Sequence, residues 1–111
     1  MFKLSIENTV PVPVKFTLQS GGLVRLFTFS LVCSRLEQNE ISERLEDKGR
    51  RVNDFMRDVI TSWDGQRLVL NPDDTPADFS PEALDVLLNV AGVAVVAFNA
   101  YFKACGAKEK N

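Results

Sequence analysis

Two adjacent glycines divide the first third of the chain into two apolar segments that have the period of β-strands. Every second residue from Val12 to Leu18 is apolar, and residues 23–33, after Gly21-Gly22, are rich in β-branched and aromatic side chains. Paired glycines supply the positive φ angles that a two-residue hairpin turn requires. We therefore predict an antiparallel β-hairpin in which residues 12–19 pair with residues 23–33.

The segment before this hairpin carries weaker strand signals. Apolar and polar residues alternate over residues 2–7, which makes this segment a candidate third strand. Pro11 and Pro13 follow, and a proline has no backbone N–H to donate to a neighbouring strand. We expect this stretch to be an edge strand or a connector, and not a central strand.

Residues 36–63 have the pattern of helices. Charged residues dominate residues 36–48, where a helix is expected to end at Gly49. Residues 50–63 then carry an apolar stripe at helical spacing, formed by Val52, Phe55, Met56, Val59, Ile60 and Trp63. We predict a helix from Arg50 to Trp63 that packs on the apolar face of the hairpin.

Residues 64–79 form an acidic connector with two prolines, which predicts a loop. Its aspartates do not have the spacing of a calcium-binding loop. Ser80 then has the properties of a helix N-cap, with Pro81 at the first helical position. Gly92 is expected to separate this helix from a second one over residues 93–105, so that residues 80–105 are helical.

These patterns together predict one α+β domain over residues 1–111. In this prediction an N-terminal antiparallel hairpin, with residues 2–7 as a candidate third strand, packs on three to four α-helices. The domain would consist of a hairpin region (1–33), a helical region (36–63), the acidic connector (64–79) and the C-terminal helices (80–105).

The composition excludes several classes of function. The chain has no histidine, and Cys33 and Cys105 do not form a CxxC pair, which removes the usual zinc ligand sets and most general-base chemistry. We expect no catalytic residues, no metal and no cofactor. The net charge is −2 and the basic residues are scattered, so no nucleic acid partner is expected.

Membrane insertion and secretion are not expected either. The longest apolar run, Val90 to Phe98, has nine residues, and a membrane-spanning helix needs about 20. The start of the sequence does not have the pattern of a signal peptide. We therefore expect a cytoplasmic protein with two reduced, buried thiols.

The run from Val90 to Phe98 is apolar nearly all round. Such a helix is buried in a core, in a contact between copies of the chain, or in the groove of a partner, and the sequence leaves these alternatives open. Trp63, as the one tryptophan, is either an interface anchor or a core residue. The candidate partner-binding residues are Trp63, Leu87, Val93, Val96, Phe98, Tyr101 and Phe102.

One set of short segments is informative in combination. It consists of Phe27-Thr28-Phe29-Ser30-Leu31-Val32-Cys33-Ser34-Arg35-Leu36, Asn53-Asp54-Phe55-Met56-Arg57-Asp58-Val59-Ile60-Thr61-Ser62-Trp63-Asp64-Gly65, Phe79-Ser80-Pro81-Glu82-Ala83-Leu84, Leu87-Leu88, Gly92-Val93-Ala94 and Ala100-Tyr101. Together these segments resemble small tail assembly chaperones of long-tailed phages. The similarity spans residues 15–105, and the connector of this chain is longer and more acidic than the family pattern.

The resemblance implies a non-enzymatic chaperone that coats the tape measure protein and keeps it soluble. The chaperone would leave as tail tube proteins polymerise, act in the host cytoplasm, and be absent from the mature virion. Its partners would be the tape measure protein and the tail tube protein, with a homo-oligomer as an open alternative. Two other functions are open: a tail completion or adaptor subunit that stays in the virion, and a small regulatory protein-binding module.

Overall fold

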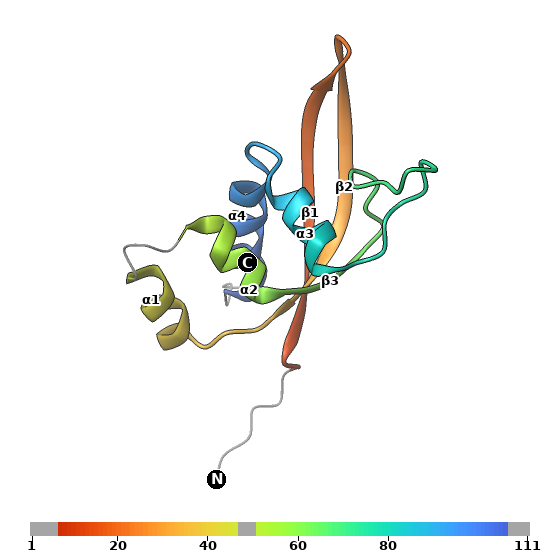
Figure 1. Ribbon diagram of the computed structural model, residues 1–111. Coiled ribbons are helices and arrows are strands. Elements are labelled where there is room, and N and C mark those ends of the chain that lie inside the picture. The colour runs from red at the N-terminus through yellow and green to blue at the C-terminus, as the bar shows by residue number, and fades with distance from the viewer. Residues whose placement is uncertain (1–6, 47–50, 107–111) are drawn as a thin grey trace, which may run out of the picture.

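A three-stranded antiparallel sheet packed on helices forms the described part of the chain, residues 7–46 and 51–106 of the computed structural model (Figure 1). The predicted α+β class is confirmed. The elements are β1 (Thr9–Ser20), β2 (Leu23–Ser34), α1 (Gln38–Glu46), α2 (Val52–Val59), β3 (Ile60–Asp64), α3 (Pro81–Leu88) and α4 (Val93–Cys105).

The predicted hairpin is confirmed, and it is longer than expected. The β1–β2 ladder runs from the pair Thr9/Ser34 to the pair Ser20/Leu23. The turn between the strands has φ angles of 58° at Gly21 and 81° at Gly22. Both angles lie in the region that a tight hairpin turn requires and that only glycine adopts at little cost.

The two prolines lie in β1, at the edge of the sheet, whose strand order is β1-β2-β3. The backbone N–H of Arg35 donates a hydrogen bond of 2.7 Å to the carbonyl of Asn8. Because bonded and non-bonded pairs alternate along an antiparallel ladder, Pro11 and Pro13 fall at non-bonded positions of this register. Their nitrogens therefore face away from β2, and the expected edge position is confirmed.

The predicted helix over residues 50–63 is wrong at its C-terminal end. Helix α2 ends at Val59, and Ile60–Asp64 form β3, which pairs with β2 through Trp63/Leu31 and Ile60/Cys33. The free edge of β2 needs a hydrogen-bonding partner at this point, and this tertiary demand overrides the helical period of the apolar residues. The observed third strand is thus β3, while residues 2–6 of the candidate strand lie outside the described residues.

The helix signals in the second half are confirmed. The hydroxyl oxygen of Ser80 accepts a hydrogen bond of 3.1 Å from the backbone N–H of Ala83, and Pro81 is the first residue of α3. Gly92 has a φ angle of 85° and directly precedes α4. Helix α1 lies within the predicted 36–48 segment, and Gly49 lies outside the described residues.

The core lies between the inner face of the sheet and helices α2, α3 and α4. Along β1 every second residue from Val10 to Val14 is buried, while the alternate residues are exposed. Phe55 of α2 is at the centre, with 1% of its surface exposed. Its ring contacts the rings of Phe98, Tyr101 and Phe102 at centroid distances of 5.4, 5.9 and 6.3 Å.

Substituting Ser80 with alanine is expected to lower the free energy of unfolding by about 1 kcal/mol, because the N–H of Ala83 loses its cap. Chemical denaturation measures this loss. Ser20→Ala is the matched control, because Ser20 is exposed at the end of β1 and caps no helix. Equal effects of the two substitutions would show that the cap does not stabilise α3.

Candidate protein-binding surfaces

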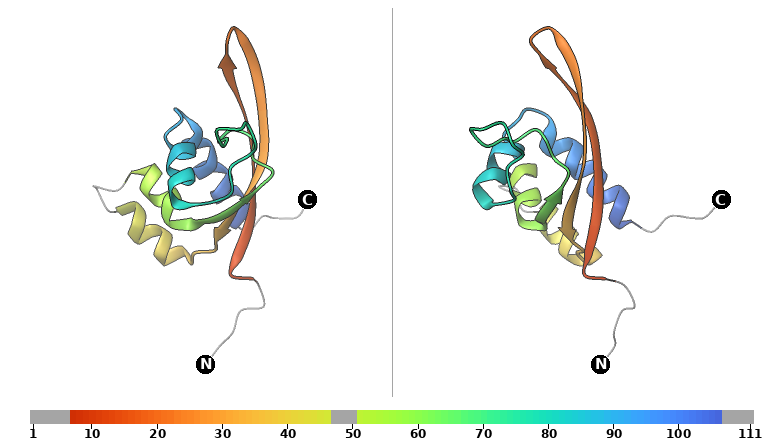
Figure 2. Two further views of the ribbon diagram at one scale, coloured as in Figure 1. Left: turned by 45° about the vertical axis from the view of Figure 1, so that its right-hand side comes forward. Right: turned by 90° about the vertical axis from the view of Figure 1, so that its right-hand side faces the viewer.

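The end of the hairpin projects beyond the helices (Figures 1 and 2). Strand β3 pairs with β2 only from Ser30 onward, so within the described ranges residues 23–29 have β1 as their one neighbouring strand. We call residues 19–26 the arm tip, and every residue in it is exposed. Its large apolar side chains are Leu23, Val24 and Leu26, with 71%, 65% and 58% of their surfaces exposed.

The arm tip was missed as a candidate site, although the sequence contains a signal for it. Leu23 and Val24 are adjacent, so their side chains point to opposite faces of the sheet. A single layer of helices covers one face, so it cannot bury both residues. Clustered apolar side chains left in water commonly mark a contact with another molecule.

The hairpin is also basic. Lys15 and Arg25 are its only charged residues between Thr9 and Ser34. The guanidinium of Arg25 lies 5.1 Å from the ring centroid of Phe27, in a cation–π contact. The surface near the arm tip thus combines apolar side chains with positive charge.

A second apolar surface lies on α4. Val95, Phe98 and Phe102 stand three and four residues apart, hence on one face of the helix, and we call them the α4 stripe. Val95 is 52% exposed, while Phe98 and Phe102 are half-buried, with ring centroids 4.7 Å apart. The stripe therefore offers both aliphatic and aromatic surface to a partner.

Three of the seven candidate residues lie inside the core. Leu87, Val93 and Tyr101 are exposed by 0%, 3% and 0%, so a partner cannot reach them in this conformation. The Tyr101 hydroxyl donates a hydrogen bond of 2.7 Å to the carbonyl of Ser34 and accepts one of 3.3 Å from the N–H of Leu36. Tyr101 thus connects α4 to the segment that follows β2.

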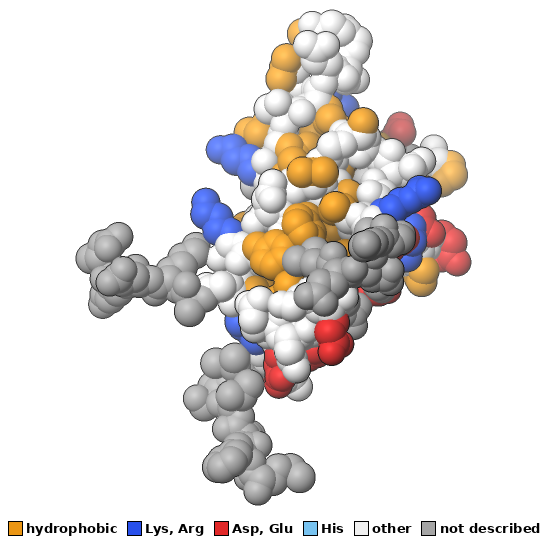
Figure 3. Space-filling model, turned by 90° about the vertical axis from the view of Figure 1, so that its left-hand side faces the viewer, with side chains coloured by type: hydrophobic (Ala, Val, Ile, Leu, Met, Phe, Trp, Pro, Cys, Tyr) orange, Lys and Arg blue, Asp and Glu red, His pale blue; other side chains and the backbone are white. Residues whose placement is uncertain are grey.

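A small cleft of about 110 Å³ lies between β1 and the start of α4. Phe16, Leu18 and the candidate residue Val96, all half-buried, contribute apolar surface to it. On the side of the molecule drawn in Figure 3, apolar side chains occur on the projecting hairpin and in a cluster at the middle of the face.

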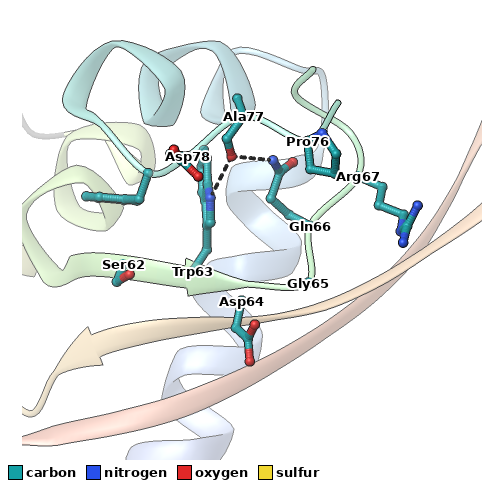
Figure 4. A pocket seen from close by; sticks show the side chains of 10 residues that line it. Ser62, Trp63, Asp64, Gly65, Gln66, Arg67, Pro76, Ala77 and Asp78 are labelled. Carbon is teal, nitrogen blue, oxygen red and sulfur yellow. Dashed lines mark hydrogen bonds between the residues drawn. The ribbon is translucent and has the colours of Figure 1, made fainter. Parts of the chain in front are cut away.

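Trp63, the remaining candidate, lines a larger hollow of about 390 Å³ in the connector (Figure 4). We call it the connector hollow. Trp63 and Phe79 are half-buried, and their rings meet edge to face at a centroid distance of 5.2 Å. The hollow is lined by Ser62, Trp63, Asp64, Gly65, Gln66, Arg67, Pro76, Ala77, Asp78 and Phe79.

Gln66 holds the backbone around this hollow in place. Only 2% of its surface is exposed, and its amide nitrogen donates to the carbonyls of Val69 (2.9 Å) and Ala77 (3.1 Å). Its amide oxygen accepts from the N–H groups of Leu68 (3.1 Å) and Val69 (2.8 Å). The sequence carried no signal for this role, because a glutamine after Asp64-Gly65 is typical of an exposed turn.

Further along, the connector is acidic and closed by local hydrogen bonds. The Asp73 carboxylate accepts from the hydroxyl of Thr75 at 2.6 Å and from its N–H at 3.2 Å. These bonds stabilise the charged form and lower the pKa of Asp73. The predicted loop is confirmed, and Leu70 pairs with Pro76 in an isolated bridge.

The two cysteines are free thiols. Cys33 is buried as predicted, whereas the predicted burial of Cys105 is wrong, because this residue near the end of α4 is half-buried. Among residues 7–46 and 51–106, no group of three or more Asp, Glu, Cys or His side chains could hold a metal ion. In the same ranges no single helix is long and apolar enough to cross a membrane. Helices α3 and α4 reach that length and composition only as a pair, bent by 103°.

Comparison with known proteins gives no match to this chain among protein-family models, curated proteins or solved structures.

Proposed function

We propose that the protein is a non-enzymatic phage tail assembly chaperone that binds and solubilises the tape measure protein. The observation that carries this proposal is the α4 stripe, in which Val95 is 52% exposed beside two half-buried phenylalanines. The sequence resemblance described above supports the choice of client.

The chemistry of the stripe suits a helical client. A long helical protein with apolar stripes aggregates unless another surface covers those stripes, and a helix can dock against such a surface through residues at i, i+3, i+4 and i+7. Val95, Phe98 and Phe102 have the complementary spacing. Each Å² of apolar surface that is buried contributes about 25 cal/mol to the free energy of binding. A stripe of three residues buries a small area, so we expect the client to bind reversibly.

This function places the protein in the host cytoplasm during tail assembly and outside the mature virion. Tail tube protein would then be the second partner, because its polymerisation around the tape measure protein releases the chaperone. A regulatory protein-binding module is a weaker proposal, since no surface described above favours it.

The projecting hairpin favours a second candidate, a tail completion or adaptor subunit that remains in the particle. A permanent neighbour would keep the exposed Leu23, Val24 and Leu26 covered. Mass spectrometry of purified virions separates the two functions, because a chaperone is absent from the particle and a subunit is present in fixed copy number.

Substituting Val95 with glutamate is expected to reduce solubilisation of a co-expressed tape measure protein at least about tenfold. The reason is that a carboxylate at the most exposed position of the α4 stripe opposes apolar burial. The measurement is the soluble fraction of the tape measure protein after co-expression. The fold is expected to persist, because Val95 is exposed.

Val86→Glu is the matched control. Val86 is 57% exposed and lies on α3, outside the stripe, so the same chemical change occurs at a similar exposure on another surface. It is expected to leave solubilisation unchanged. The proposal fails if the wild-type protein does not raise the soluble fraction, and the α4 stripe is excluded as the binding surface if both variants act alike.

A further inference from the structure

The connector hollow combines aromatic ring surface with charged side chains. Two of its polar groups are already bonded, because Trp63 Nε1 and Gln66 Nε2 both donate to the carbonyl of Ala77, at 3.2 and 3.1 Å. The partly exposed rings of Trp63 and Phe79 offer apolar surface to an occupant, together with Pro76. An occupant that brings an apolar side chain next to a cation would bury the first against the rings and meet the acidic groups of the lining with the second.

The hollow lies in the most acidic connection of the described chain. Residues 64–79 contain four aspartates and one arginine, a net charge of −3 (1 − 4). Asp64 and Asp78 belong to the lining of the hollow. Arg67 also belongs to it, but Figure 4 shows its side chain directed away from the carbonyl of Ala77. The region around the hollow therefore favours a partner with positive charge.

The arm tip offers the matching properties. Leu23 and Val24 are 71% and 65% exposed, and the hairpin carries Lys15 and Arg25 without any acidic residue. A continuous ladder of strand pairs from Thr9/Ser34 to Ser20/Leu23 makes the hairpin stiff. The tip therefore does not fold back onto the connector of its own chain, whose backbone lies well below it in Figures 1 and 2.

We propose that the arm tip of one copy docks into the connector hollow of a second copy. Leu23 enters the hollow against Trp63 and Phe79, and Arg25 lies near Asp78. The contact joins two different surfaces, so it is heterologous and builds a ring or an open chain of subunits. The contact uses neither Val95 nor the rest of the α4 stripe. The proposal of this contact therefore goes beyond the proposed chaperone function and is tested independently of it.

Sedimentation velocity of the full chain over a range of concentrations tests the association. The wild-type protein is expected to self-associate, and Leu23→Asp is expected to weaken the association at least about tenfold, because a charge replaces the inserted apolar side chain. Circular dichroism checks that the variant is folded. A wild-type protein that remains monomeric at the highest concentration, or an unchanged association of Leu23→Asp, overturns the proposal.

A charge exchange tests the orientation of the contact. Arg25→Glu and Asp78→Arg are each expected to weaken the association a few-fold, and their combination in one chain is expected to restore it, because the attractive pair is rebuilt with reversed sign. If the combined variant associates no better than the weaker single variant, Arg25 does not lie near Asp78 and the proposed docking is wrong.

Oxidative cross-linking distinguishes this contact from a symmetric pairing of two hairpins. When Leu23→Cys protein is mixed with Asp78→Cys protein, the mixture is expected to form a cross-linked dimer that neither variant nor the wild type forms alone. The wild-type control accounts for Cys33 and Cys105. A cross-link in Leu23→Cys protein alone would show that two arm tips meet each other, and would overturn the proposal.

Discussion

Substituting Phe55 with alanine is expected to lower the free energy of unfolding by about 3–5 kcal/mol. The Phe55 side chain is 1% exposed and contacts the rings of Phe98, Tyr101 and Phe102. Its removal leaves a cavity between α2 and α4, and it also removes three aromatic contacts. A loss of this size is a large share of the stability of a typical small domain.

Denaturant titration followed by far-ultraviolet circular dichroism measures this effect. The midpoint is expected to fall while the slope of the free energy against denaturant stays constant, because the native fold is retained. Val86→Ala is the control, since Val86 is 57% exposed, and its effect is expected to stay within about 0.5 kcal/mol. A similar loss at both positions would contradict a core centred on Phe55.

Alkaline pH is expected to destabilise the protein through Cys33. Burial, together with the charge of the nearby Cys105, raises the pKa of the Cys33 thiol from 9.0 to about 12. Above pH 9 the unfolded chain releases this proton while the folded chain retains it, so the free energy of unfolding falls as the pH rises. Below pH 9 the protonated Cys33 thiol makes its full contribution to the free energy of unfolding. By pH 12 the free energy of unfolding has fallen by about 4 kcal/mol, at 1.36 kcal/mol for each pH unit.

The difference between wild type and Cys33→Ala isolates this effect from other alkaline titrations. The variant is expected to be less stable at pH 8 and to lose less stability between pH 9 and pH 12. Cys105→Ala is the control, because it leaves Cys33 buried and therefore retains most of the dependence on pH. Burial also raises the pKa of Tyr101, so part of the dependence is expected to remain in Cys33→Ala. Parallel profiles of Cys33→Ala and wild type would contradict the prediction.

The sequence predicted the turns and helix starts that depend only on neighbouring residues. Gly21-Gly22 indicates the hairpin turn because both positions need positive φ angles, and this also determines which residues pair. Ser80 and Pro81 indicate the start of α3 because the cap and the first helical position involve only neighbouring residues. Gly92 precedes α4 at the expected residue for the same reason.

Strand β3 could not be predicted in this way. Ile60 and Trp63 continue the apolar stripe of Phe55 and Val59 at helical spacing, so the period favours one uninterrupted helix. The chain instead leaves the helix at Ile60, because pairing with β2 satisfies backbone groups that would otherwise lack partners. That demand arises from a strand about 30 residues away, and a periodicity within residues 50–63 does not contain it.

The exposure of the candidate binding residues could not be predicted, for a related reason. Periodicity identifies which face of a helix is apolar, but it does not say what covers that face. Tyr101 is enclosed while Val95 remains 52% exposed, although both are apolar residues of the same helix, α4. The difference depends on how α2 and β1 pack against α4, and these contacts appear only in the folded chain.

The two prolines of β1 remove hydrogen-bond donors from the outer edge of this strand, which is one of the two edges of the sheet. Pro11 and Pro13 leave two places in the outward-facing row of backbone groups where no donor exists. A foreign strand laid along that border could not complete a ladder, which protects the protein against amyloid-like stacking. Any protein present at high concentration benefits from such a safeguard. Restoring both donors, by Pro11→Thr and Pro13→Thr, would remove it.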